Sequence, residues 1–200
     1  MKKILIYIIL INFTFATQSY FFGGGFGQLE EKRITSSELR TYDSDGLSYE
    51  AGFSWNKMVI RDFNYKLELG IGAKYQSSII TEDFLKDSYV NTIPLYLNAR
   101  LSTKSRAINY FIEGQLGYSF VDEGKIIDDL EQSLDDSIKV IGGFYSGIEL
   151  GAEISDFYVA FNYSASNFTR KESKYLIEKD YRSHIVKLIA TFLPNELQMV

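Results

Sequence analysis

The residues most able to do chemistry are a single histidine and the serines around it. His184 is the only histidine in the chain, and Ser183 comes directly before it. A serine can be activated by a histidine only when the two side chains are within hydrogen-bond reach, but neighbours in a strand point to opposite faces. Ser164 and Ser166 share their face with Asn162 and not with a histidine. We therefore predict no catalytic residue, and we expect His184 to lie near the external rim of the fold.

A glycine run and an acidic segment are the other candidates for ligand chemistry. Residues 23 to 27 are Gly-Gly-Gly-Phe-Gly, but no Gly-Lys-Ser/Thr follows, as a phosphate-binding loop requires. Glycines in a strand suit close packing inside a narrow barrel. Residues 121 to 139 hold seven acids and two lysines, a net charge of −5, without the alternating ligands and central glycine of a calcium loop. We predict no metal site and no cofactor.

Nine charged side chains share one face of the extended segments, where their neighbours on the same face are mostly Gly, Ser and Asn. They are Glu50, Lys66, Glu68, Lys74, Arg100, Glu113, Glu149, Glu153 and Lys187. Four cations nearly balance five carboxylates. Because buried charges persist when they are paired and hydrogen-bonded, we predict an internal salt-bridge network.

The elements that hold these charges are strands. Residues 140 to 165, VIGGFYSGIELGAEISDFYVAFNYSA, alternate apolar with polar or small residues twice, with a polar break at Ser155-Asp156. A period of two predicts strands, and the short break predicts a tight hairpin. The pattern recurs, and Pro94 should lie near the beginning of its strand or at a bulge. The predicted strands cover about residues 19 to 28, 48 to 56, 63 to 76, 93 to 102, 108 to 120, 144 to 154, 157 to 165 and 185 to 192.

The fold predicted from these segments is all-β, an eight-stranded antiparallel up-and-down transmembrane β-barrel. Eight strands enclose a space only just wide enough for side chains, so the bulky apolar face would overfill it. That face should therefore contact lipid. The predicted lipid-facing residues are Leu67, Leu69, Ile71, Leu95, Leu97, Ile112, Leu116, Ile148, Leu150, Val159, Phe161 and Leu188.

The predicted connections alternate between long and short, as they do in outer-membrane barrels. The long loops, which should be external, cover residues 29 to 46, 77 to 89, 121 to 139 and 167 to 180. Within the third loop, Ile127, Leu130, Leu134 and Ile138 have helical spacing, which predicts a short amphipathic helix over the barrel mouth.

The first residues have the pattern of an export signal. Met1-Lys2-Lys3 is basic, residues 4 to 15 are apolar and uncharged, and small residues precede a cleavage site after Ala16. We predict a signal peptide at 1 to 16 and an outer-membrane β-barrel domain at 17 to 200. Loss of Lys2 and Lys3 changes the formal charge from −5 to −7, which argues against a nucleic-acid partner.

Three stretches carry a resemblance to a known family. They are residues 93 to 97, IPLYL, residues 110 to 120, YFIEGQLGYSF, and residues 147 to 153, GIELGAE. These stretches resemble the strands of the small porin-like outer-membrane β-barrels related to OmpA and OmpX. The resemblance implies a barrel in the outer membrane of a Gram-negative cell. It implies no single activity, because members serve in adhesion, envelope integrity, small-solute passage or unknown roles.

The sequence thus predicts a non-enzymatic, monomeric protein of the outer membrane. Its partners would be outer-membrane lipid and an external surface partner that the long loops contact. Two alternatives stay open, an outer-membrane lipid-modifying enzyme and a soluble periplasmic lipid-binding barrel, which would place the apolar face inside.

Overall fold

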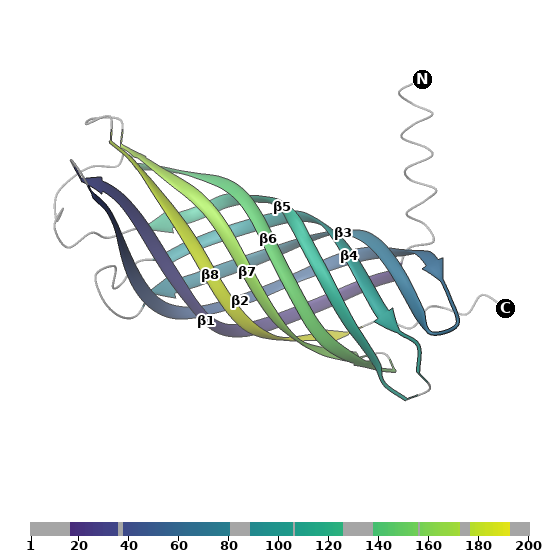
Figure 1. Cartoon of the computed structure of the whole chain (residues 1–200). Helices are drawn as coiled ribbons and strands as arrows, with labels where there is room; N and C mark the ends of the chain where they lie inside the picture. The colour runs from purple at the N-terminus through teal and green to yellow at the C-terminus, as the bar shows by residue number, and fades with distance from the viewer. Residues whose placement is uncertain are drawn as a thin grey trace, which may run out of the picture.

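The computed structural model describes residues 17–35, 38–80, 89–105, 107–125, 138–155, 157–172 and 177–192. These residues form eight strands that pair in chain order and close into one antiparallel barrel (Figure 1), which confirms the predicted fold. The strands are β1 (Thr17–Thr35), β2 (Glu38–Arg61), β3 (Tyr65–Ile80), β4 (Tyr89–Thr103), β5 (Asn109–Lys125), β6 (Ile138–Ile154), β7 (Phe157–Glu172) and β8 (Ile177–Phe192). The predicted signal peptide at 1 to 16 lies outside the described residues.

The barrel closes where the last strand meets the first. β1 and β8 pair from Tyr20 opposite Phe192 to Lys32 opposite Asp180, and we call this the closing seam. Because every strand has a neighbour on both sides, backbone donors and acceptors are satisfied within the sheet, as the interior of a bilayer requires. In the described part of the chain, no helix is long and apolar enough to span a membrane.

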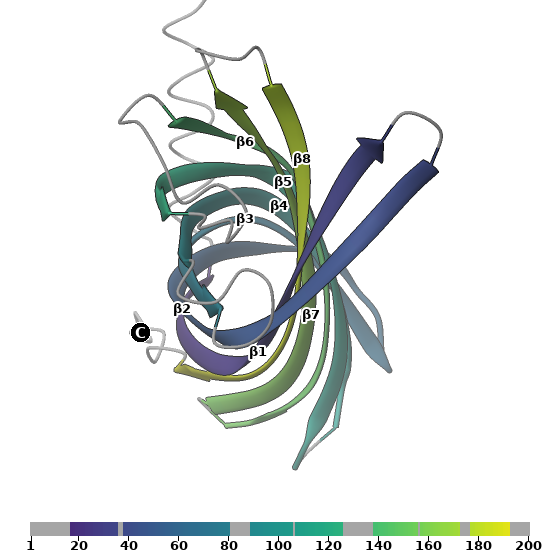
Figure 2. The ribbon, with the colours of Figure 1, turned by 90° about the vertical axis from the view of Figure 1, so that its left-hand side faces the viewer.

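The strands are much longer than the sequence pattern predicts. β2 has 24 residues and β1 has 19, whereas about 9 to 11 residues suffice to cross a bilayer. The predicted loop 29–46 is therefore wrong, because residues 29–35 and 38–46 are strand (Figure 2). The other predicted loops also lose their ends to strands, and the predicted helix falls mostly in 126–137, outside the described residues. Where both faces of a hairpin contact water, the apolar period disappears while backbone pairing continues.

The two ends of the barrel differ in their connections. At one end, here called the short-turn end, β2 and β3 are joined by residues 62–64. The predicted end of the second strand at residue 56 is wrong, because β2 continues to Arg61 with an irregularity between Met58 and Ile60. The opposite end, called the long-hairpin end, carries the β1–β2, β3–β4, β5–β6 and β7–β8 connections. Pro94 lies inside β4, and the β3–β4 ladder is interrupted beside it, between the pairs Ala73–Leu95 and Gln76–Thr92.

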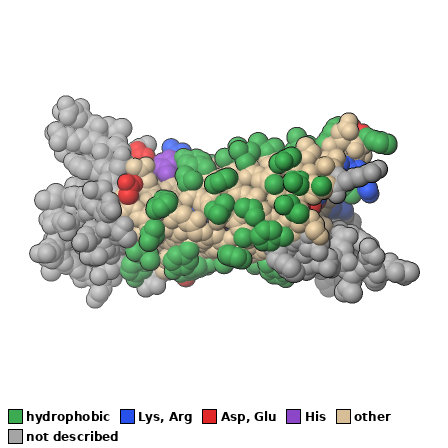
Figure 3. All heavy atoms as spheres, turned by 90° about the horizontal axis from the view of Figure 1, so that it is seen from below, with side chains coloured by type: hydrophobic (Ala, Val, Ile, Leu, Met, Phe, Trp, Pro, Cys, Tyr) green, Lys and Arg blue, Asp and Glu red, His purple; other side chains and the backbone are tan. Residues whose placement is uncertain are grey.

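The outer wall is apolar and the interior is polar. Exposed apolar side chains, here called the apolar band, lie on all eight strands, and Figure 3 shows them along one face of the barrel. Ten of the twelve predicted lipid-facing residues are exposed on the outer wall, while Leu67 and Ile71 are half-buried there. A soluble lipid-binding barrel would have the opposite arrangement, so that alternative is wrong.

Candidate functional site

The structure places all nine predicted charges on the lumen side of the wall. Six of them expose at most 4% of the side chain: Glu50, Lys74, Arg100, Glu113, Glu149 and Lys187. The other three, Lys66, Glu68 and Glu153, are partly exposed near the short-turn end. We call the buried six the lumen network.

One half of the network is centred on Glu50. A single carboxylate oxygen, Oε2, accepts from Lys187 Nζ at 2.5 Å and lies 2.9 Å from Lys74 Nζ. Lys187 is on β8 and Glu50 is on β2, so their contact passes over β1. The residues of β1 that pair with them are Gly25 and Gly23, and a Cβ at Gly25 would lie 2.7 Å from the Cα of Lys187. The glycine run clears the space that lets charges meet across the closing seam.

The other half is centred on Arg100. Its Nε donates to Glu113 Oε2 at 2.7 Å, and its Nη2 donates to the hydroxyl of Tyr158 at 3.0 Å and lies 3.8 Å from Glu149 Oε1. The guanidinium also lies against two neighbouring rings, 4.3 Å from the centre of Phe111 and 4.6 Å from that of Tyr158. Arginine combines forked hydrogen bonding with stacking on aromatic faces, which a lysine could not do here.

Uncharged side chains connect the two halves. The hydroxyl of Tyr145 donates to Gln115 Oε1 at 2.7 Å, and Gln115 Nε2 donates to Glu113 Oε1 at 2.8 Å. The ammonium of Lys74 lies 5.0 Å from the centre of the Tyr145 ring. The lumen network therefore contains three basic and three acidic side chains, whose formal charges sum to zero. The surplus negative charge lies with Lys66, Glu68 and Glu153, where water reaches.

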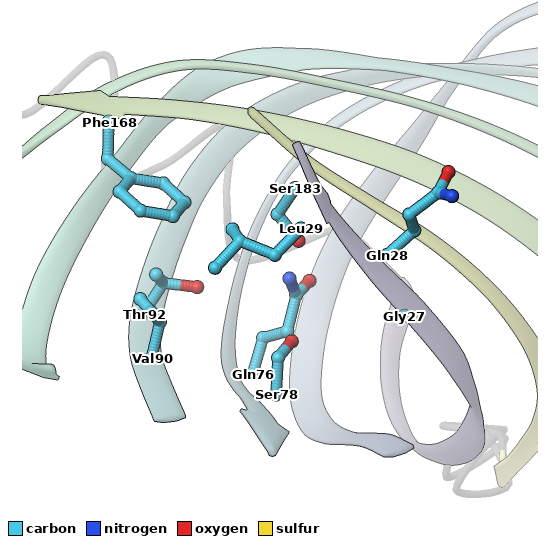
Figure 4. Close-up of a pocket in the computed structure, with 9 residues that line it drawn as sticks. All are labelled: Gly27, Gln28, Leu29, Gln76, Ser78, Val90, Thr92, Phe168 and Ser183. Atoms are coloured by element: carbon cyan, nitrogen blue, oxygen red, sulfur yellow. The ribbon is translucent and has the colours of Figure 1, made fainter. Parts of the chain in front are cut away.

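Apolar groups lie beyond the network toward both ends. On the long-hairpin side, Leu29, Val90 and Phe168 are buried around a narrow cavity (Figure 4). The cavity has room for roughly one water molecule. On the short-turn side, Phe111 packs with Tyr158. Buried apolar side chains thus flank the charged network on both sides, among polar neighbours.

Aromatic rings inside the lumen are the part of the interior that sequence reasoning missed. The pattern predicted a face built mainly from Gly, Ser and Asn with a few charges. The buried rings are in fact Phe21, Tyr96, Phe111, Tyr145, Tyr158 and Phe168. Several lie over glycines, since a Cβ at Gly72 would come within 2.4 Å of Tyr96 and one at Gly151 within 2.5 Å of Phe111. Glycines opposite rings were the available signal.

His184 lies on the outer wall and not in the lumen. Its Nδ1 is 2.6 Å from the hydroxyl of Tyr163, and its Nε2 is 3.4 Å from Glu30 Oε2. Ser183, the neighbouring residue, is buried on the lumen side, as are Ser164 and Ser166. The hydrogen-bond partners of the histidine are therefore a phenol and a carboxylate, and none of these serines shares its face. Among the described residues, no cluster of three or more His, Cys, Asp or Glu could hold a metal ion.

Comparison with known proteins finds likeness in fold and not in sequence. No family model and no curated protein matches the chain. The structure of the outer membrane enzyme PagL superposes with a TM-score of 0.52 at 15% identity, over 86% of this chain and 99% of that one. The outer membrane protein OprG from Pseudomonas aeruginosa gives 0.44 at 10% identity, over 90% and 98%. Neisserial surface protein A gives 0.41 at 10% identity, over 88% and 97%.

The chain has the fold of the small outer-membrane barrels. Together with the apolar outer wall, this fold identifies an integral protein of the outer membrane. The fold alone assigns no activity, because one fold can host unrelated functions.

Proposed function

We propose that the protein is a non-enzymatic, monomeric outer-membrane barrel, closed to solutes, which presents its long hairpins to the medium for surface interaction or envelope integrity. The observation that carries this proposal is the lumen network. Six buried charges contact one another and their polar neighbours across a space that eight strands make just wide enough for side chains. A solute would have to break these contacts in order to pass.

The long-hairpin end supports the second half of the proposal. Binding residues are commonly carried on connections that a rigid scaffold positions. β1, β2 and the strands beside them extend well past the length needed to cross a bilayer, and segment 121–139 concentrates a net charge of −5. An external partner of that segment would be basic, and its binding would weaken as salt rises.

A lipid-modifying enzyme is the second candidate, and His184 is the observation that would favour it. A histidine held by a carboxylate on the lipid-facing wall has the orientation of a general base. Its other partner, however, is the phenol of Tyr163, and Ser164 and Ser166 lie in the lumen. We therefore favour the non-enzymatic function.

Conductance tests the closed lumen. Refolded protein in planar bilayers should show no steady channel current, because the lumen network fills the path. An Arg100→Ala variant, which removes the side chain in contact with Glu113 and Tyr158, serves as the comparison for a loosened lumen. Steady current through the unaltered protein would contradict the proposal.

Binding tests the hairpins. The refolded barrel is screened against host matrix proteins and envelope lipids, and the screen is repeated after residues 124–137 are replaced by a short Gly-containing turn. A matched variant keeps the length and changes Asp128, Asp129, Asp135 and Asp136 to Asn. Both should remain folded, which a heat-dependent shift on SDS gels reports, and both should bind less. Binding that survives both changes would remove this segment from the proposal.

A further inference from the structure

Three side chains on neighbouring strands form a polar cluster on the outer wall, which we call the rim cluster. Tyr163 on β7, His184 on β8 and Glu30 on β1 are joined in a row by the two contacts of the imidazole. The rings of Tyr163 and His184 are stacked, with centres 6.0 Å apart and planes at 24°. His184 and Glu30 keep 22% and 20% of their side chains exposed, so a ligand outside the barrel can reach them.

The rim cluster lies at the edge of the apolar band. The next outward residues on β8 after His184 are Val186 and Leu188, and Phe26 comes before Gln28 and Glu30 on β1; all three apolar side chains are exposed. On the long-hairpin side of the cluster, Arg182 is the next outward residue of β8. Figure 3 shows charged and His side chains beside this end of the apolar band. One wall thus offers polar groups at headgroup depth and apolar groups directly below.

The hydrogen bonding of the cluster leaves acceptors and donors side by side. With the phenol donating to Nδ1 and Nε2–H donating to Glu30, the tyrosine oxygen and the carboxylate retain lone pairs. Exposed donors come from the cross-strand neighbours, since Gln28 pairs with His184, and Arg182 pairs with both Glu30 and Asn167. Glu30 and Arg182 cancel in charge. A phosphate would require a surplus of cations, whereas sugar hydroxyls, which both donate and accept, match this balanced set.

We propose that the rim cluster binds the sugar-containing headgroup of a membrane glycolipid in the leaflet on the long-hairpin side. The cluster faces sideways from the wall, at the boundary where a lipid headgroup lies, and the ligand's acyl chains would lie on Phe26, Val186 and Leu188. The exposed phenol and imidazole rings present flat surfaces to the sugar, and the polar atoms around them fix its orientation.

Native mass spectrometry tests this assignment. The full barrel is refolded in tetraethylene glycol monooctyl ether, a detergent without sugar, and mixed with equal amounts of monogalactosyl diacylglycerol and phosphatidylglycerol that carry the same acyl chains. The glycolipid should be retained preferentially. The double variant Tyr163→Phe, His184→Gln should lose roughly five- to ten-fold of that retention, because the phenol hydroxyl is removed and the imidazole ring is replaced by a flexible amide.

A matched control is available on another strand. Tyr118 on β5 is 42% exposed against 44% for Tyr163, and its hydroxyl donates to the Gly142 carbonyl, so Tyr118→Phe should leave glycolipid retention unchanged. Heat-dependent gel mobility confirms that each variant is folded. Equal retention by the double variant, or preference for phosphatidylglycerol, would overturn the proposal. Displacement of the glycolipid by an equal concentration of methyl galactoside would overturn its lipid part.

Discussion

Two clusters of charge span the closing seam, and they differ chiefly in how much water reaches them. Inside, Lys187 and Lys74 share the carboxylate of Glu50, and their side chains are at most 1% exposed. Outside, His184 contacts Glu30 with about a fifth of each side chain exposed. Breaking a buried pair leaves an uncompensated charge, whereas an exposed pair contributes little to stability. The inner cluster therefore belongs to the structure, and the outer one is free to take part in recognition.

The largest expected effect comes from removing the central inner carboxylate. Glu50→Gln leaves two buried lysines without their shared counter-charge and should lower the free energy of unfolding by about 3 to 5 kcal/mol. Urea unfolding in lipid vesicles, followed by the fluorescence of Trp55, measures it. Glu153→Gln is the control at the partly exposed short-turn end, where the change should stay within about 1 kcal/mol. Similar losses of stability for Glu50→Gln and Glu153→Gln would mean that burial does not decide how much a charge contributes to stability.

A charge placed on the outer wall should have the next largest effect. Leu69 is exposed on the outer face of β3, which runs from Tyr65 to Ile80, and Leu69→Arg should cost up to about 2 to 4 kcal/mol and impair membrane assembly, because the charge enters hydrocarbon. Glu68→Gln, one residue away on the lumen face, should leave assembly largely intact. Assembly is scored as the heat-modifiable fraction on gels. A reversal of the two effects would reverse the assignment of inside and outside.

Substitutions at two glycines compare the packing of the lumen face with that of the outer face. Gly72→Ala places a methyl group against the ring of Tyr96 and should cost about 1 to 3 kcal/mol, because the enclosed ring must move. Gly114 faces outward with nothing within 4 Å of an added Cβ, so Gly114→Ala should be neutral or slightly stabilising. The same urea unfolding measurement compares them, and equal effects would show that the lumen is loosely packed.

The smallest expected effect is at the rim cluster. His184→Gln removes a partly exposed contact and should change the free energy of unfolding by less than about 1 kcal/mol. The unfolding transition in vesicles at neutral pH provides the measurement, with wild-type protein alongside. A loss as large as that of Glu50→Gln would mean that the outer cluster fastens the seam and is not free for recognition.

The sequence predicted the membrane-crossing core of each strand because lipid on one side and a polar lumen on the other impose a period of two. The ends of the strands were missed, since residues such as those at 38–46, ELRTYDSDG, pair in β2 but show no alternation of apolar and polar residues. The alternation of side chains along each strand also predicted that the nine charged residues share one face. It did not predict their partners, because Lys187 reaches Glu50 over β1, and that contact depends on the register of three strands.

The outer cluster shows the same limit. Because Ser183 and His184 are neighbours in a strand, the sequence predicted that they point to opposite faces, and the structure places the serine in the lumen. Nothing in the spacing indicates that Glu30, 154 residues away, should contact the histidine, because the seam joins the two ends of the chain only on closure.

The contact of Lys187 with Glu50 over the glycines of β1 favours the native alignment of the final strand over shifted alignments during assembly. β8 is apolar on both faces, with Ile185 and Ile189 inside and Val186 and Leu188 outside, so its hydrophobicity alone would accept more than one alignment. A slip of one residue exchanges the faces of a strand and would turn Lys187 toward lipid. Glu50 precedes Lys187 by 137 residues, so this ion pair can form only when β8 closes the barrel. A misaligned closure would leave Lys187 without its counter-charge, since Glu50 would keep only Lys74, whereas the native closure is held by the ion pair.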